Sequence, residues 1–60
     1  MNEYKVVLRS EKSWLELNKP NILTYNVWDF DETKARIQAV KLNEKKFGEN
    51  DYCVVEVVKL

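Results

Sequence analysis

Residues 52–60, YCVVEVVKL, form a β-branched run that predicts a strand with apolar side chains on both faces. Strict alternation would give one face Tyr52, Val54, Val58 and Leu60, interrupted by Glu56, and the other face Cys53, Val55 and Val57, ending at Lys59. A chain with one helix covers only one face of a sheet. The run therefore predicts either a central place in the sheet or a surface that a partner covers.

Two further strands are predicted before this run. Residues 3–9 alternate between apolar and mostly charged side chains, with Tyr4, Val6 and Leu8 on one side. Residues 22–28 predict a second strand, with one face made of Leu23, Tyr25 and Val27 and the other of Ile22, Thr24, Asn26 and Trp28. The segment 18–21, NKPN, is a turn signal before that strand. Residues 14–17 fit either a short strand or an ordered loop.

A helix is predicted from about Glu32 to Phe47. Asp31 is the better N-cap, and Asp29 with Glu32 is the competing capping box. Gly48 follows as the expected stop. A stripe at helical spacing predicts the face toward the sheet: Ala35, Ala39, Val40, Leu42 and Phe47, with Ile37 at its margin. The side toward water is predicted to carry Lys34, Gln38, Lys41 and Lys45.

These elements predict a single α+β domain over residues 1–60. It has a small, mostly antiparallel sheet of three or four strands with one helix packed on one face, in the order strand, optional strand, strand, helix, strand. The helical crossover makes the last strand parallel to the strand at 22–28. Either these two strands are adjacent, or the first strand lies between them as in a split βαβ unit.

Composition argues against several classes of protein. Ten Lys and Arg balance ten Asp and Glu, whereas nucleic-acid binders usually carry a basic excess. Cys53 is the only cysteine and histidine is absent, so neither an intrachain disulfide nor a His/Cys zinc site can form. We interpret Cys53 as a small buried hydrophobe. No apolar stretch is long enough to span a bilayer, and the amino terminus does not resemble a signal peptide, so we expect a cytoplasmic protein without a membrane partner.

No motif of an enzyme or of a cofactor site is present. The chain lacks a phosphate-binding glycine loop, a nucleophile elbow and a metalloprotease helix. The acidic residues Asp29, Asp31 and Glu32 are explained by helix capping rather than by metal binding. We therefore expect no enzymatic activity, no metal and no cofactor.

The hypothesis that follows is a small protein-binding module. Excess apolar and aromatic surface on a sheet with one helix points to a protein partner or to a second copy of the chain in a homodimer. The residues expected to bind are Trp14, Ile22, Trp28, Tyr52, Val55 and Val57. The Trp14 segment could instead fold back over the open sheet face. Small motif-free proteins of this kind are common among phage-encoded or mobile-element inhibitors and antitoxins that block a host protein.

A different class of function is the alternative. The aromatics Tyr4, Tyr25, Trp28 and Tyr52 could stack on bases in a small RNA- or DNA-binding module, with surface lysines neutralising phosphates. Glu56 interrupts one apolar face of the run at 52–60, and an isolated buried carboxylate is costly. We expect it at a sheet margin, paired across strands with Lys5 or Arg9, or facing a basic partner.

Overall fold

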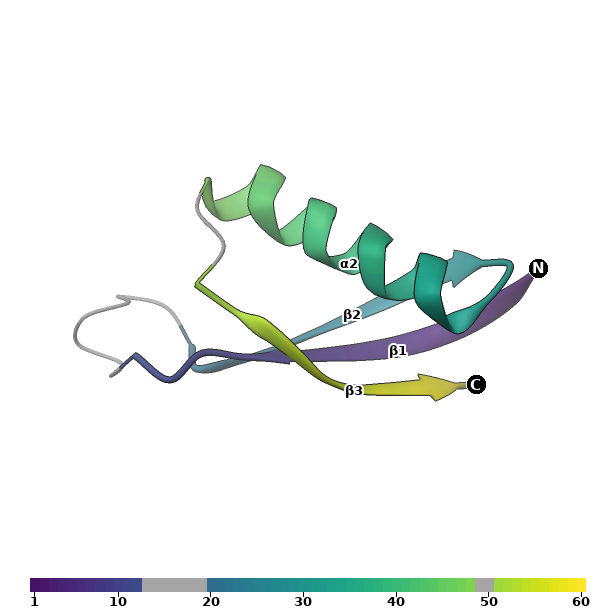
Figure 1. The fold of residues 1–60 in the computed structure, drawn as a ribbon, viewed down its shortest axis with the longest axis horizontal. Coiled ribbons are helices and arrows are strands. Elements are labelled where there is room, and N and C mark those ends of the chain that lie inside the picture. Colours follow the sequence, from purple (N-terminus) through teal and green to yellow (C-terminus); the bar gives the residue numbers. More distant parts are fainter. Residues whose placement is uncertain (13–19, 49–50) are drawn as a thin grey trace.

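The computed structural model describes residues 1–12, 20–48 and 51–60, which fold as a sheet with one helix lying across it (Figure 1). The elements are β1 (Asn2–Arg9), β2 (Ile22–Asp29), α2 (Glu32–Phe47) and β3 (Cys53–Lys59). This confirms the predicted α+β class and the predicted limits of the elements to within one residue. The question of a strand at residues 14–17 lies outside the described residues.

The first strand occupies the centre of the sheet. The strand order is β2-β1-β3, and β1 is antiparallel to both neighbours. Tyr4, for example, lies opposite Val27 on one side and Lys59 on the other. The order is that of the split βαβ alternative. Of the two alternatives for residues 52–60, the central place is therefore wrong, because β3 is an edge strand.

A β-bulge in β3 changes which side chains share a face. Val7 of β1 pairs with Glu56, but the next residue, Leu8, pairs with Val54. Val55 is the extra residue, so that Val55 and Glu56 together oppose Val7. An extra residue reverses the alternation beyond it. Val57 therefore packs against the core together with Val54, and the predicted grouping of Val57 with Val55 is wrong.

The core lies between α2 and one face of the sheet. It consists of the buried residues Tyr4, Val6, Leu8, Val27, Ala35, Ala39 and Tyr52. Partly buried side chains pack around them: Leu23, Tyr25, Val40, Val54 and Val57. The two alanines on α2 allow the helix backbone to approach the large side chains of β1 and β2 closely, so the core is thin.

The ends of α2 are set by local signals that the sequence predicted. The Asp31 carboxylate accepts a hydrogen bond of 2.8 Å from the backbone N–H of Lys34, which confirms Asp31 as the N-cap. At the other end Gly48 has a positive φ of 85°, and its N–H donates to the Glu44 carbonyl over 2.7 Å. This left-handed conformation favours glycine, so Gly48 ends the helix.

The buried stripe of α2 differs from the predicted one at a single step. Leu42 is exposed, whereas its neighbour Asn43 is completely buried. The Asn43 Oδ1 accepts a 2.9 Å hydrogen bond from the Tyr25 hydroxyl, and its Nδ2 has no partner within the described ranges. Residues 35, 39 and 43 repeat every four positions, so they form one row facing the sheet. The prediction that Leu42 packs in the core is wrong. Asn43 faces the sheet in its place, where it accepts the hydrogen bond from the partly buried Tyr25 hydroxyl.

Candidate protein-binding surface

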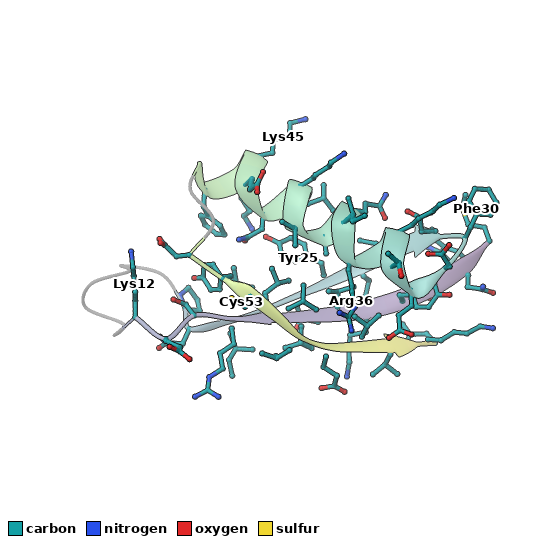
Figure 2. All side chains as sticks on the ribbon, in the orientation of Figure 1. Lys12, Tyr25, Phe30, Arg36, Lys45 and Cys53 are labelled. Carbon is teal, nitrogen blue, oxygen red and sulfur yellow. The ribbon has the colours of Figure 1, made fainter. Side chains whose placement is uncertain are left out.

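The side of the sheet opposite α2 has no covering layer in the part of the chain that the structure describes. Figure 2 shows the helix on one side of the sheet and a row of side chains projecting from the other. We call this second side the open sheet face. Strand register and exposure assign the following residues to it: Glu3, Lys5, Val7, Arg9, Ile22, Thr24, Asn26, Trp28, Val55, Glu56 and Val58.

Three large apolar side chains on the open sheet face are more than half exposed: Ile22, Trp28 and Val55. Ile22 and Trp28 lie at opposite ends of the edge strand β2, because they pair with Arg9 and Glu3 respectively. Val55 lies on the other edge strand, at the bulge. The exposed apolar groups therefore surround the half-buried Val7 at the centre of the face rather than gather at one corner.

Charges on the open sheet face are balanced. Lys5 and Arg9 on β1 face the same side as Glu3 and Glu56. Glu56 is exposed on the edge strand, which confirms its expected place at a sheet margin. Among the described residues it makes no ion pair with Lys5 or Arg9, although both lie diagonally across the strand pair. These charged groups therefore remain accessible to a partner.

The structure brings together three of the residues that the sequence predicted for binding and separates the others. Ile22, Trp28 and Val55 lie on the open sheet face, and Trp14 falls outside the described residues. Val57 packs against the core, for the reason of register given above. Tyr52 is buried as well.

The burial of Tyr52 has two causes. Its ring stacks on Phe47, with 6.4 Å between ring centroids, and its hydroxyl donates to the carbonyl of Pro20. Burial raises the pKa of Tyr52, and the nearby Asp51 carboxylate raises that pKa further. Tyr52 therefore anchors the start of β3 to the segment before β2, and it does not contribute to the open sheet face.

The aromatic platform of the nucleic-acid alternative is largely absent from the open sheet face. Of its four aromatics, Tyr4 and Tyr52 are buried under α2, and Tyr25 points toward Asn43. Burial and the neighbouring Tyr52 raise the pKa of Tyr25. Only Trp28 of this set lies on the open side. Successive bases stack on several exposed rings, so this sheet offers no such series.

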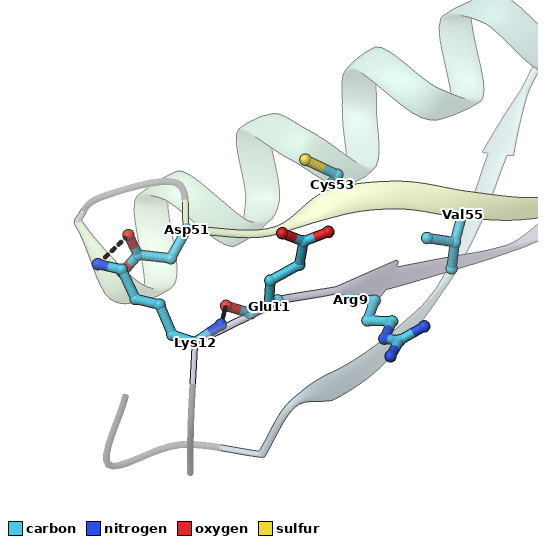
Figure 3. Close-up of a pocket in the computed structure, with 7 residues that line it drawn as sticks. Arg9, Glu11, Lys12, Asp51, Cys53 and Val55 are labelled. Atoms are coloured by element: carbon cyan, nitrogen blue, oxygen red, sulfur yellow. Dashed lines mark hydrogen bonds and ion pairs between the residues drawn. The ribbon is translucent and has the colours of Figure 1, made fainter. Parts of the chain in front are cut away.

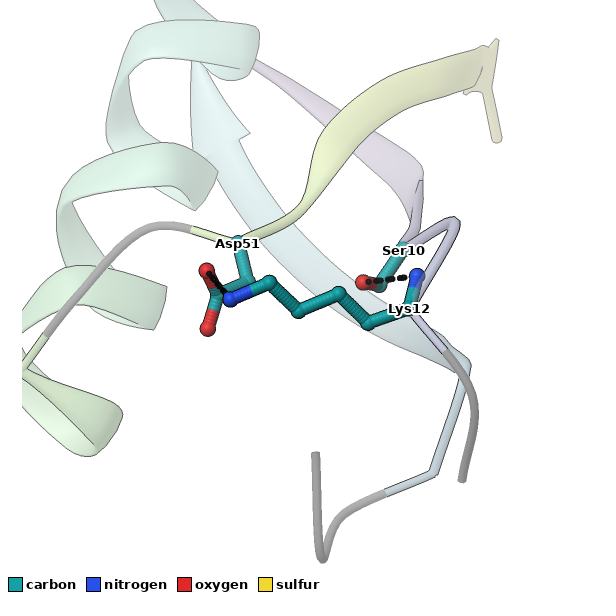
Figure 4. Close-up of polar contacts among 3 residues, drawn as sticks. All are labelled: Ser10, Lys12 and Asp51. Atoms are coloured by element: carbon teal, nitrogen blue, oxygen red, sulfur yellow. Dashed lines mark hydrogen bonds and ion pairs between the residues drawn. The ribbon is translucent and has the colours of Figure 1, made fainter. Parts of the chain in front are cut away.

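A hollow of about 320 Å³ lies where β1 ends and β3 begins (Figure 3). Its walls are formed by Arg9, Ser10, Glu11, Lys12, Asp51, Cys53 and Val55. The Lys12 Nζ and an Asp51 oxygen are 2.8 Å apart, and the Lys12 N–H donates to the Ser10 hydroxyl over 3.2 Å (Figure 4). Mixed charge of this kind matches no single ligand class. The hollow is therefore a structural junction that borders the open sheet face.

Cys53 differs from its interpretation as a buried hydrophobe. The residue is exposed and carries a free thiol. It begins the edge strand β3 opposite Arg9, and no further strand lies beyond it in the described ranges. The prediction was wrong because a valine-rich flank does not reveal that a strand lies at the edge of a sheet.

Comparisons of this chain with protein-family models, with curated protein sequences and with solved structures give no match. No group of metal-ligating side chains is present within residues 1–12, 20–48 and 51–60. The helix described in the structure is too short and too polar to cross a bilayer.

Proposed function

We propose that this chain is a non-enzymatic protein-binding module that binds its partner through the open sheet face. The observation that carries the proposal is the exposure of Ile22, Trp28 and Val55 on a sheet face without a covering layer in the described part of the chain. Tryptophan is enriched among residues that dominate binding energy, because it buries a large area and keeps one hydrogen-bond donor. Exposed apolar surface with a polar rim is a common feature of protein–protein interaction sites.

The rest of the face supports a protein partner. Its two cations and two carboxylates can form specific pairs without giving the face a net charge. Binding should therefore depend on salt far less than phosphate recognition does. The edge of β2 that faces away from β1 offers a second way to bind a protein. Eight consecutive residues of β2 pair with β1 without interruption, so this strand is regular and its outer edge can accept a strand from a partner. The bulge makes the edge of β3 a poorer template.

The class of module that fits these features best is an inhibitor or antitoxin of the phage or mobile-element type. Such a protein acts by covering a surface of a host protein, so it needs an exposed binding face and no catalytic machinery. A second copy of the chain is the other occupant of this face to be considered. Both occupants predict the same binding residues and differ in the mass of the complex.

Mass in solution separates the two occupants first. Light scattering over a concentration series, with reducing agent present, would show a dimer if the open sheet faces pack together. A monomer directs the search to another protein, by affinity capture with wild type and with Trp28→Ala and Val55→Asp variants. Lys45→Ala, on the exposed side of α2, is the matched control.

We expect Trp28→Ala and Val55→Asp to abolish capture of the partner, or dimer formation, while circular dichroism shows an unchanged fold. Both side chains are more than half exposed, so their replacement should affect folding little. Lys45→Ala should behave as wild type. Retention of the interaction in both sheet variants would refute binding through the open sheet face.

A further inference from the structure

The outer side of α2 carries a second exposed surface, separate from the open sheet face. Phe30, just before the helix, is 64% exposed, and the Lys34 Nζ lies 5.4 Å from the centre of its ring. One helical step further, Ile37 is 49% exposed, with Lys41 four residues beyond it. Residues 34, 37 and 41 are spaced by three and four positions, which aligns them along one side of the helix, and Phe30, which precedes the helix, joins them through its contact with Lys34. We call these four residues the helix ridge.

Hollows lie on both sides of this ridge. One, of about 280 Å³, is lined by Asp29, Lys34, Ile37, Gln38 and Lys41. The other, of about 300 Å³, is lined by Arg36, Ile37, Val40, Lys41 and Glu44. Both hollows share Ile37 and Lys41, so these two side chains form a crest between two grooves. A crest between grooves is the shape onto which a second helix packs, with its own side chains entering the grooves.

The charge of α2 indicates what kind of helix would pack there. The helix carries five cations (Lys34, Arg36, Lys41, Lys45 and Lys46) against two acids (Glu32 and Glu44). Its one ion pair among the described residues, between Arg36 and Glu32, spans 3.9 Å, with both side chains more than half exposed. Five cations against two acids leave α2 with a local excess of three positive charges in a chain that has no net charge. A surface with such an excess attracts acidic partners.

We propose that the helix ridge binds an amphipathic acidic helix of a partner protein. Ile37 and Phe30 would supply the apolar contact, and Lys34 and Lys41 would pair with carboxylates on either side of it. The exposed apolar groups favour a protein over a nucleic acid, because an isoleucine side chain at the crest makes no favourable contact with phosphate groups. This inference does not rest on the proposed function, since the two surfaces share no residue.

The test uses the whole ¹⁵N-labelled protein and two synthetic helical peptides. In the first peptide Leu occupies one stripe at heptad spacing and Glu the flanking positions. The second has Lys in place of every Glu. We expect the acidic peptide to shift the amide resonances of residues 30–45, with saturation below about 1 mM peptide. The Lys peptide should leave these resonances unchanged.

Variants identify the surface that is used. Ile37→Ala and Lys41→Glu should each weaken the binding of the acidic peptide about tenfold. Leu42→Ala is the matched control, because Leu42 is 43% exposed on the same helix and lines neither hollow. Trp28→Ala should leave the affinity for the peptide unchanged. The experiment therefore distinguishes a failure of the helix-ridge proposal from a failure of the proposal that a partner binds the open sheet face.

Four results would overturn the inference. They are an absence of shifts at about 1 mM acidic peptide, equal binding of the Lys peptide, equal weakening by Leu42→Ala and Ile37→Ala, and tighter binding of a DNA duplex than of the acidic peptide. The first result would exclude an acidic helix as the partner, and the second would remove the charge argument. The third would remove the ridge as the binding surface, and the fourth would assign the cations of α2 to phosphates.

Discussion

The hydrogen bond between Tyr25 and Asn43 makes the stability of this fold testable by a pair of substitutions. Asn43→Leu removes a completely buried amide whose Nδ2 has no partner among the described residues, and puts an apolar side chain of similar volume in its place. Tyr25→Phe removes only the hydroxyl. It leaves the Asn43 side chain buried with neither of its polar atoms bonded.

The magnitudes follow from what each substitution leaves unpaired. A buried polar atom without a partner costs about 1–3 kcal/mol, whereas a hydrogen bond contributes about 1 kcal/mol net. Tyr25→Phe should therefore lower the free energy of unfolding by about 1–3 kcal/mol. Asn43→Leu removes one unpaired atom and one hydrogen bond, and the half-buried Tyr25 hydroxyl can turn toward water. We expect this variant to be about 1 kcal/mol more stable than wild type.

Urea unfolding followed by tryptophan fluorescence measures both variants and the double variant. In the double variant an aromatic ring without its hydroxyl faces an aliphatic side chain, so the penalty of Tyr25→Phe should disappear, and the coupling between the two sites should equal that penalty, about 1–3 kcal/mol. In a chain of this size a change of about 1 kcal/mol corresponds to roughly 4–8 °C in Tm. A loss of stability in Asn43→Leu, or no loss in Tyr25→Phe, would show that the Asn43 amide is not the unpaired group described here.

Three further outcomes are expected. Burial raises the pKa of Tyr25 and Tyr52, so the folded state holds these phenol protons more tightly than the unfolded chain does. The contribution of both groups to the free energy of unfolding is therefore fully present below about pH 10 and is lost as the pH rises further. In urea unfolding at increasing pH, the free energy of unfolding should fall less steeply in Tyr52→Phe than in wild type. Gly48→Ala should cost about 1 kcal/mol in thermal melts through its φ of 85° alone, since an added Cβ meets nothing within 4 Å. Deletion of Val55 should keep the fold by circular dichroism and increase self-association in light scattering, because it straightens an edge strand that the bulge protects; an unfolded product would contradict the register.

Local signals in the sequence were sufficient for the helix and for the existence of three strands. Asp31 and Gly48 act through their own backbone neighbours, so their roles could be predicted without knowledge of the fold. The alternation in β2 placed Ile22 and Trp28 on the face away from the core in the same way. Each of these predictions depends only on residues within a few positions of each other.

The predictions that failed depend on contacts between distant segments. The bulge at Val55 arises where β3 meets β1, and strict alternation within β3 cannot reveal it. Asn43 replaces Leu42 in the core because Tyr25, on another element, presents a hydroxyl there. Tyr52 is buried by its contacts with Phe47 and with Pro20, and Pro20 lies far away in the sequence. The helix ridge was missed for a related reason, since exposed lysines at helical spacing are typical of any solvated helix.

The central position of β1 has a consequence for how the protein is made. Among the described elements β1 is synthesised first and its partner β3 last, so Tyr4 can pair with Lys59 only after β2 and α2 have been translated. Until β3 follows, one edge of an apolar strand has no partner, even after β1, β2 and α2 are complete. Such long-range pairing slows folding and leaves nascent chains open to aggregation. A chaperone that captures extended apolar segments on the ribosome would therefore compete with β3 for the same edge of β1.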